Sequence, residues 1–307
     1  MRNTARALDP GRLGMAALSL LVLAGRATPL PAQAPIDWSK VAGALGKSGS
    51  IQPGDVYKVS LPRSDLHVTA AGVAVKPALA LGSWVAFKQA GSSSEARAMG
   101  DLVLLESEVG PVVRKLQEDS IEQTAIHNHL LHESPHMMYV HIRGQGNPVE
   151  LASAIHSALG LSKTPFGETA KKPESIALDT AAVSQALGQA GKVNGGVYQV
   201  SIPRAEKITE GGMEVPPAMG VATALNFQPT GGKRAAITGD FVLIGSEVNP
   251  VIKTLRQNGI QVTALHSHML DESPRLFFMH FWANDDAVKL ATGLRAALDK
   301  MNVKRAS

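Results

Sequence analysis

Hydrophobic residues recur with two different periods along this chain, and each period predicts a different kind of element. Alternating apolar and polar positions, typical of β-strands, occur at residues 55–61, 66–75, 83–88 and 101–107. Apolar spacings of three and four residues predict short helices at Trp38–Leu45 and Thr180–Leu187. Two further helices are expected to begin near Pro111 and Pro250, because proline is favoured in the first turn of a helix. Two closing helices follow, with the apolar faces Val149, Leu151, Ala152, Ile155, Leu159 and Val288, Leu290, Ala291, Leu294, Leu298.

The chain repeats itself. VYKVSLPR at 56–63 returns as VYQVSIPR at 197–204, and GDLVLLESEV at 100–109 returns as GDFVLIGSEV at 239–248. The polar segment 163–175, which contains proline and glycine, lies between the copies and is typical of a linker. We therefore divide the chain into a leader at 1–34, a first repeat at 35–162, a linker at 163–175 and a second repeat at 176–307.

The order of elements in each copy predicts the fold class. Several strands come first, and the second half then reads strand, helix, strand, strand, helix, which is compatible with a ferredoxin-like β-α-β-β-α layer. We predict an α+β fold of two tandem repeats, each a mostly antiparallel sheet with helices. Two such copies in one chain are expected to pack as a pseudo-dimer.

The first 34 residues have the pattern of a secretory signal peptide. Arg2, Arg6 and Arg12 precede the apolar run LGMAALSLLVLA at 13–24, and Ala32–Ala34 supplies a small-residue cleavage site. The apolar run is short for a membrane span. We therefore expect cleavage and export of a periplasmic or secreted protein, with no membrane span in the mature chain. An uncleaved short anchor is the alternative.

Composition restricts the chemistry further. Without the leader the chain has 26 basic and 25 acidic residues of the original 30 and 26, so a near-neutral surface gives no reason to expect nucleic acid. The sequence contains no cysteine, which excludes disulfides, thiolate metal sites and a lipid-modified cysteine. Any metal must therefore use histidine, carboxylate, carbonyl or water. The sequence leaves the oligomeric state open, and a small molecule or a component of the cell envelope is a possible ligand.

Six of the ten histidines occur in one motif that is present twice. His-x-His-x11-His is found in HNHLLHESPHMMYVH at 127–141 and in HSHMLDESPRLFFMH at 266–280, an offset of 139 residues. Residues two apart in a strand share a face, so each His-x-His pair projects together. If the following loop centres on Ser134, His127 faces His141 and three imidazoles converge, whereas a register one residue different sends His141 to the opposite face.

Converging imidazoles favour a divalent transition metal such as Zn, Cu, Fe or Mn. We predict two sets of ligands, in which a glutamate serves as a fourth ligand or as a base for a bound water. Glu108 and Glu247 are alternative ligands, and Arg63 and Arg204 are expected to be solvated at strand ends. His132 and His136 have no equivalents in the second repeat and are expected to decorate a turn. The predicted ligands are His127, His129, Glu133 and His141, and then His266, His268, Glu272 and His280.

Three functions remain open at this level. The first is a metal-binding protein, and the second is a metal-dependent hydrolase or oxidoreductase that uses metal-bound water with Glu133 or Glu272 as base. The third is an envelope binding or scaffolding module whose histidines are structural or respond to pH. No P-loop, nucleophile elbow or His-Glu-x-x-His motif occurs, so the catalytic residues of an enzyme stay unknown.

The second repeat resembles a known family. The run HSHMLDESPRLFFMHFW at 266–282 and the preceding GDFVLIGSEV are similar to the LppY/LpqO family, also called the DUF1259 domain, and the first repeat resembles it more loosely. The resemblance implies export and duplication. Several family members are lipoproteins, and this chain departs from them because it lacks the lipid-attachment cysteine. The family has no established reaction, so the resemblance implies no ligand assignment.

Overall fold

The computed structural model describes Met1 and residues 35–91, 94–167 and 175–304 of the chain. The predicted signal peptide lies outside the described residues except for Met1, and so does the middle of the predicted linker. None of the helices in the described segments is long and apolar enough to cross a membrane.

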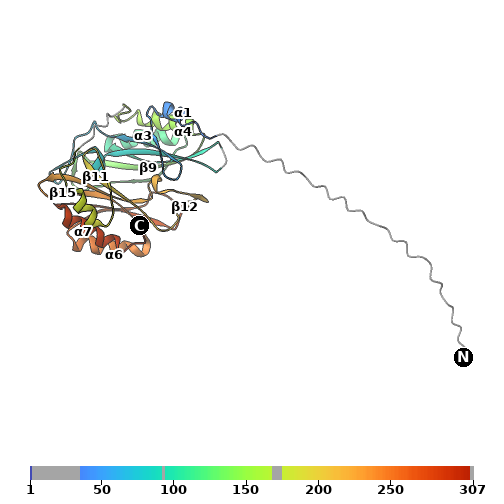
Figure 1. Cartoon of the computed structure of the whole chain (residues 1–307). Coiled ribbons are helices and arrows are strands. Elements are labelled where there is room, and N and C mark those ends of the chain that lie inside the picture. Colours follow the sequence, from blue (N-terminus) through green and yellow to red (C-terminus); the bar gives the residue numbers. More distant parts are fainter. Residues whose placement is uncertain (2–34, 92–93, 168–174, 305–307) are drawn as a thin grey trace. The chain divides into compact units, whose positions relative to one another are not determined.

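The first repeat is built on a six-stranded antiparallel sheet with the strand order β1-β2-β5-β6-β9-β7 (Figure 1). Strand β9 lies between β6 and β7 and is antiparallel to both, so the β6-α3-β7 connection is a split β-α-β unit. The predicted ferredoxin-like half is therefore present. The elements are α1 (Trp38–Leu45), β1 (Ser50–Gln52), β2 (Val56–Pro62), β3 (Val68–Ala70), β4 (Val73–Val75), α2 (Pro77–Ala80), β5 (Gly82–Gln89), β6 (Ala96–Leu105), α3 (Glu106–Glu118), β7 (Glu122–His127), β8 (Glu133–Ser134), β9 (Met137–Gly146) and α4 (Pro148–Leu159).

The second repeat has the same topology, with the strand order β10-β11-β14-β15-β18-β16. Each repeat also has a small three-stranded sheet, β4-β3-β8 in the first and β13-β12-β17 in the second. The elements are α5 (Thr180–Leu187), β10 (Lys192–Asn194), β11 (Val197–Pro203), β12 (Thr209–Glu210), β13 (Met213–Glu214), η1 (Pro217–Met219), β14 (Ala222–Gly231), β15 (Arg234–Ile244), α6 (Gly245–Gln257), β16 (Gln261–His266), β17 (Glu272–Ser273), β18 (Leu276–Asp286) and α7 (Ala287–Leu298).

The two middle helices begin earlier than predicted. Helix α3 begins at Glu106 and α6 at Gly245, so Pro111 and Pro250 lie inside the helices and the predicted starts are wrong. The reason is a carboxylate in the first turn. Glu108 accepts a hydrogen bond from the backbone N–H of Leu105 at 2.9 Å, which satisfies a donor that the helix itself cannot.

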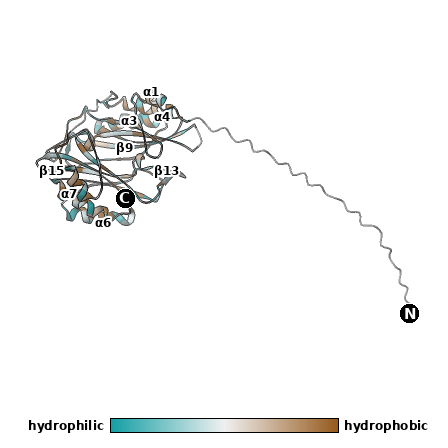
Figure 2. Cartoon of the chain, viewed as in Figure 1, coloured by the Kyte–Doolittle hydropathy of each residue, from teal (hydrophilic) through white to brown (hydrophobic). Residues whose placement is uncertain are grey.

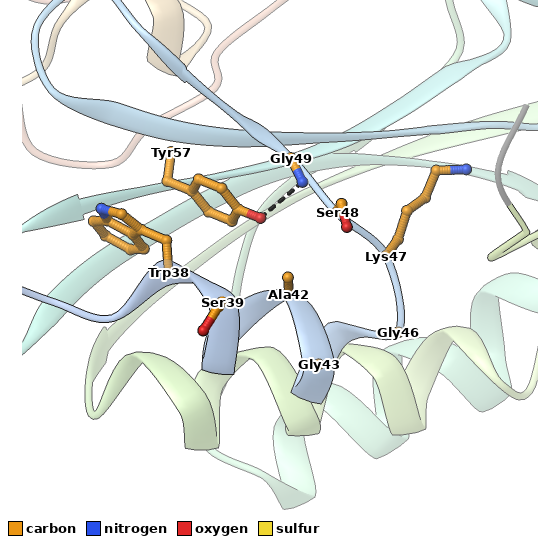
Figure 3. A pocket seen from close by; sticks show the side chains of 9 residues that line it. All are labelled: Trp38, Ser39, Ala42, Gly43, Gly46, Lys47, Ser48, Gly49 and Tyr57. Atoms are coloured by element: carbon orange, nitrogen blue, oxygen red, sulfur yellow. Dashed lines mark hydrogen bonds between the residues drawn. The ribbon is translucent and has the colours of Figure 1, made fainter. Parts of the chain in front are cut away.

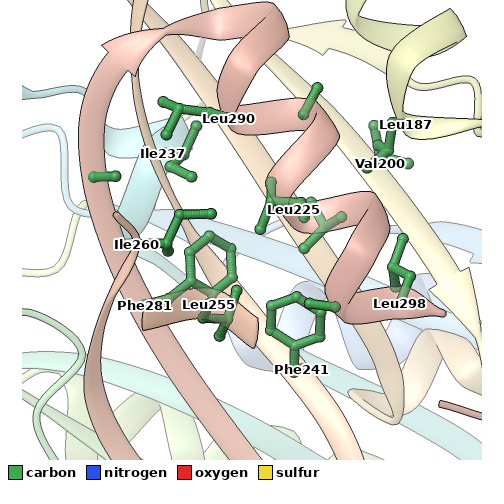
Figure 4. Packing of buried hydrophobic residues seen from close by; sticks show 14 of the residues in the cluster. Leu187, Val200, Leu225, Ile237, Phe241, Leu255, Ile260, Phe281, Leu290 and Leu298 are labelled. Atoms are coloured by element: carbon green, nitrogen blue, oxygen red, sulfur yellow. The ribbon is translucent and has the colours of Figure 1, made fainter. Parts of the chain in front are cut away.

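One face of each sheet packs against helices. In the second repeat Phe241, Phe281 and Leu225 of the sheet contact Leu255 of α6 and Leu290 of α7 in one buried cluster (Figure 4). Figure 2 shows that α6 and α7 carry hydrophobic residues on one side and hydrophilic residues on the other, as their period requires. An equivalent cluster joins α1, α3 and α4 to the sheet of the first repeat.

The other faces of the two sheets meet each other. One buried cluster combines Val103 and Tyr139 of the first repeat with Trp282 of the second, and another combines Met99 with Phe278. Hydrogen bonds cross this interface in equivalent pairs: Lys58 Nζ donates to the carbonyl of Ala218 at 2.9 Å, and Gln199 Nε2 donates to that of Ala78 at 2.7 Å. The repeats therefore pack as a pseudo-dimer, with helices on the outside and sheet against sheet between them.

Candidate metal centre

The register of β7 on β9 places the histidines of the first repeat on one face. His127 lies opposite Tyr139 and Ala125 lies opposite His141, which is two residues from the pairing expected for a loop centred on Ser134. Because a shift of two residues preserves the alternation of faces, His127 and His141 still share a face. The same pairing recurs in the second repeat, where His266 lies opposite Phe278 and Ala264 opposite His280.

The segment expected to be a turn is instead a short strand. Glu133–Ser134 forms β8 and pairs with Thr69 and Ala70 of β3, and Glu272–Ser273 forms β17 and pairs with β12. A longer connection therefore separates the two main strands. This leaves the second histidine of each His-x-His pair, His129 or His268, just beyond the end of its strand.

All six motif histidines lie in one cluster where the two sheets face each other. Each ring contacts a ring of the other repeat, and the pairs of rings follow the repeat symmetry. His127 stacks on its own equivalent His266 with 3.6 Å between ring centroids. In the two flanking pairs, His141 stacks on His268 at 3.8 Å, and His129 contacts His280 at 3.7 Å with the rings tilted by 33°.

The ligand atoms of these side chains form three overlapping groups, each within 4.8 Å. Two of the groups draw residues from both repeats, so the structure joins the two predicted histidine sets into one centre. The groups are His127, His141, His266 and His268, then His127, His129 and His280, and then Asp240, His266 and His280.

Two aspartates that the sequence analysis did not select belong to the centre. Asp101 lies opposite His141 in the β6–β9 ladder, and Asp240 lies opposite His280 in the β15–β18 ladder. Asp240 Oδ2 is 3.2 Å from His268 Nε2, and the carboxylate oxygens of Asp101 are 3.9 Å from His129 and His141. A signal for them exists in the sequence, because each repeat places a Gly-Asp pair at the same position in an otherwise apolar strand, where aspartate is disfavoured.

Backbone carbonyls orient two of the imidazoles. His280 Nδ1 donates to the carbonyl of Gly239 at 2.7 Å, and His127 Nδ1 donates to that of Asn128 at 3.0 Å. Each bond fixes the tautomer and leaves Nε2 as the lone-pair nitrogen directed into the cluster. This is the arrangement in which histidine binds metals.

Buried polar atoms without hydrogen-bond partners concentrate in this centre. Among the described residues six buried side-chain nitrogen or oxygen atoms have no such partner, and five of them belong to the cluster. Buried polar groups are normally satisfied, so five such atoms within one cluster fit cation binding. The five are Asp101 Oδ1, His129 Nε2, Asp240 Oδ1, His266 Nδ1 and His280 Nε2.

Burial keeps the imidazoles neutral. His141 and His280 are 3 % exposed, and burial lowers the pKa of His127 to about 4, of His268 to about 3 and of His280 to about 4. Burial also holds the pKa of His129 and of His141 well below the usual value, with the neighbouring histidines adding to the effect. Neutral imidazoles at pH 7 are the form that binds metals.

The two aspartates are shifted in the opposite direction. Burial raises the pKa of Asp101 to about 8, the nearby Asp240 carboxylate adds to the shift, and Lys58 opposes it. Burial raises the pKa of Asp240 to about 6, against the influence of His280. Lys58 is half-buried, with its ammonium 3.9 Å from the Trp84 ring centroid, and burial lowers its pKa to about 8. A bound cation would favour the ionised form of both carboxylates.

The structure places the predicted glutamates outside the three groups. Glu133 Oε1 accepts from the backbone N–H of Met137 at 3.0 Å, and Glu272 Oε1 accepts from that of Leu276 at 2.8 Å, so both carboxylates hold the start of the following strand. Glu272 also binds Arg275 at 3.2 Å. Glu133 Oε2 is buried without a hydrogen bond, and burial raises the pKa of this carboxyl to about 7.

The alternative ligands Glu108 and Glu247 have structural partners. Arg63 binds Glu108 at 2.7 Å and Arg204 binds Glu247 at 2.6 Å. The two arginines are only 0 % and 2 % exposed, so the expectation that they are solvated at strand ends is wrong. Each guanidinium also donates to a strand carbonyl, that of Val103 or Val242, which ties the strand end to the following helix.

Two surface hollows lie elsewhere on the chain. One is next to α1 and is lined by Trp38, Lys47, Tyr57 and neighbouring small residues (Figure 3). Trp38 stacks on Tyr57, whose hydroxyl accepts a hydrogen bond from the Gly49 N–H at 2.7 Å. The other is lined by residues of α6, such as Asn249 and Lys253. Neither hollow is lined by a histidine of the cluster.

Comparison with known families identifies the repeats. The model of the family described as Domain of Unknown Function (DUF1259) matches residues 39–161 and again residues 181–300. The chain belongs to this family. The resemblance seen in the sequence is thereby confirmed, including the presence of two tandem copies. As a DUF1259 protein with both copies in one chain, it supplies both halves of the histidine centre itself.

The remaining comparisons add little. A search of curated proteins finds no match. Among solved structures the chain is similar to one titled "Crystal structure of a trimeric bacterial microcompartment shell protein PduB", with 13 % identity over 85 % of this chain and 97 % of that chain and a TM-score of 0.23. A TM-score this low does not indicate a shared fold.

Proposed function

We propose that this protein binds a divalent transition metal at the histidine centre between its two repeats. The observation that carries the proposal is the concentration of five unpartnered buried ligand atoms among imidazoles that are neutral at pH 7. Imidazole nitrogen with one or two carboxylates is a ligand set for Zn, Cu, Fe or Mn. Hydrogen bonds between imidazoles join His127 Nε2 to His141 Nε2 and His266 Nε2 to His268 Nε2, both at 2.9 Å, but they leave these five atoms unsatisfied, whereas purely structural polar groups in a core are normally all satisfied.

Binding is favoured over catalysis by the burial of much of the centre. His141, His268 and His280 are at most 8 % exposed, and only part of the cluster, such as His129 and His266, is half-buried. A metal-dependent enzyme needs an open coordination position that a substrate can reach. One observation supports this second candidate, since a Glu133 carboxyl with a pKa of about 7 and a free Oε2 has the properties of a general base.

Export belongs to the same proposal. The Arg-containing start, the apolar run at 13–24 and the Ala32–Ala34 site support secretion of a mature chain into the periplasm or the medium. Determination of the N-terminus of the protein recovered from each cell fraction tests this. A mature N-terminus close to residue 35 in the exported fraction is the expected result, and full-length protein confined to the cytoplasm would contradict it.

The metal proposal is tested by elemental analysis of full-length protein purified without chelators. We expect bound transition metal in the unmodified chain and a loss of most of it in the His127→Ala, His266→Ala variant, which removes the central stacked pair. His136→Ala is the matched control, because this half-exposed side chain lies in the same motif but outside the three groups. Absence of metal in every sample, together with no uptake of added Zn, Cu or Mn, would refute the proposal.

A further inference from the structure

We propose that the centre holds two metal ions. Each ion is bound by the His-x-His pair of one repeat and by the last histidine of the other repeat's motif, which is His280 or His141. The inference rests on the proposed function and adds the number of ions and the division of the ligands. It assigns His127, His129 and His280 to one ion, and His266, His268 and His141 to the other. The two sets are equivalent in the repeat, because a shift of 139 residues converts each histidine of one set into a histidine of the other.

The arrangement of the rings supports two sites, one on each side of the central pair His127–His266. The central pair His127–His266 has ring contacts with both flanking pairs, His129–His280 and His141–His268. The ring contacts of the described residues include none between one flanking pair and the other. Each flanking pair therefore needs one histidine of the central pair to complete a three-histidine set.

Two of the three ligand groups each contain one proposed set, and the third joins His266 of one set and His280 of the other through Asp240. His127, His129 and His280 form one complete group within 4.8 Å. His141, His266 and His268 lie together within another group, which His127 also enters because it belongs to the central pair. Both sets thus exist as preformed clusters of nitrogens, and each set uses both repeats.

The number of donors exceeds what one ion can use. Six imidazoles and the two carboxylates of Asp101 and Asp240 offer eight residues, whereas a first-row transition ion with histidine ligands takes about four to six donors. Asp240 contacts one histidine of each proposed set, with Oδ2 3.2 Å from His268 Nε2 and Oδ1 4.0 Å from His280 Nδ1. Asp101 likewise lies 3.9 Å from His129 of one set and from His141 of the other. The carboxylates are therefore positioned to bridge two ions.

Two ions would also serve both flanking pairs, because a single ion bound at one flanking pair leaves the other pair without a cation. The four positive charges of two dications exceed the two negative charges of Asp101 and Asp240, so two charges remain for water-derived or other anionic ligands.

The test is the stoichiometry of Mn²⁺ and of Zn²⁺ on full-length, metal-stripped protein. We expect two equivalents in the unmodified chain. The His129→Ala, His280→Ala variant and the matched His141→Ala, His268→Ala variant should each retain one equivalent. Saturation at one equivalent in the unmodified chain would overturn the inference and leave the proposed function intact, whereas no binding would refute both.

A spectroscopic measurement keeps the test valid if a variant fails to fold. Two paramagnetic ions at the separation usual for two-metal sites, roughly 4 Å, are coupled. The electron paramagnetic resonance spectrum of the unmodified protein loaded with Mn²⁺ should therefore show a coupled signal. An uncoupled single-ion spectrum at full loading would contradict the inference without use of any variant.

Discussion

The hydroxyl of Thr124 in the first repeat donates a hydrogen bond to the backbone carbonyl of His268 in the second, at 2.6 Å. The equivalent bond from Thr263 to the carbonyl of His129 measures 2.5 Å. Each repeat therefore holds the second histidine of the other repeat's His-x-His pair in place. These two bonds act on residues that lie beyond the ends of their strands and have no ladder hydrogen bonds of their own.

Loss of these bonds should weaken metal binding without loss of the fold. We expect the Thr124→Val, Thr263→Val variant to bind Zn²⁺ roughly 10- to 100-fold more weakly, the usual effect of removing groups that orient metal ligands. Thr292→Val is the control, because this exposed hydroxyl bonds only to Val288 within α7. Competition with a chelator measures the affinity, and equal affinities for the two variants would show that the crossed bonds do not position the histidines.

The aspartates and the glutamates should differ in their effect on the metal. Asp240→Asn removes a charged oxygen that contacts His268 and should lower metal affinity roughly 10-fold or more. Glu272→Gln should retain the metal, because that carboxylate binds the Leu276 N–H and Arg275 rather than the cluster. Metal titration of both variants provides the comparison. A greater loss for Glu272→Gln than for Asp240→Asn would restore the glutamates as ligands.

The metal-free protein should be most stable near pH 6.5. The folded pKa values of His127, His268 and His280 lie below the ordinary value of 6.5, so the unfolded chain binds more protons below that pH and the folded state loses stability as the pH falls toward 4. Each such proton changes the free energy of unfolding by about 1.4 kcal/mol per pH unit. Asp101 acts in the opposite direction, because its raised pKa of about 8 makes the folded state lose stability as the pH rises from near 4 to 8.

Urea unfolding of chelator-treated protein at about pH 5, 6.5 and 8 measures this dependence. The histidines outnumber the aspartates, so the rise in stability up to pH 6.5 should exceed the decline above it. The metal-loaded protein is the control, since bound metal competes with protons for the same nitrogens. A metal-free protein that is more stable at pH 5 than at pH 6.5 would contradict the buried, neutral state of the imidazoles.

The buried arginines should contribute to stability far more than surface pairs. Arg204→Met leaves Glu247, which is 7 % exposed, without its 2.6 Å partner, and we expect a loss of roughly 3–5 kcal/mol in the free energy of unfolding. Lys289→Ala, which breaks a surface ion pair with Asp285, should leave the urea midpoint nearly unchanged. Similar midpoints for the two variants would show that the Arg204–Glu247 pair does not hold the strand to the helix.

The sequence by itself determined the local and repeated features of this protein. The apolar periods gave helices at Trp38–Leu45 and Thr180–Leu187 with the bounds observed, and the repeat gave two similar α+β halves. His127 and His141 also lie on one face of the sheet, as the loop centred on Ser134 predicts, because a register shift of two residues preserves the face. The starts of α3 and α6 were wrong because the capping carboxylate outweighed the proline signal.

The tertiary structure alone decided how the histidines combine. Periodicity assigns a side chain to a face of its own sheet, but it carries no information on which element covers that face. Packing of sheet against sheet brought His141 onto His268 and His129 onto His280, more than a hundred residues apart in sequence. It also placed Asp101 and Asp240 among them, because Asp101 lies opposite His141 and Asp240 lies opposite His280 in their sheets. One centre shared by both repeats is therefore a property of the interface, which neither copy of the motif could reveal.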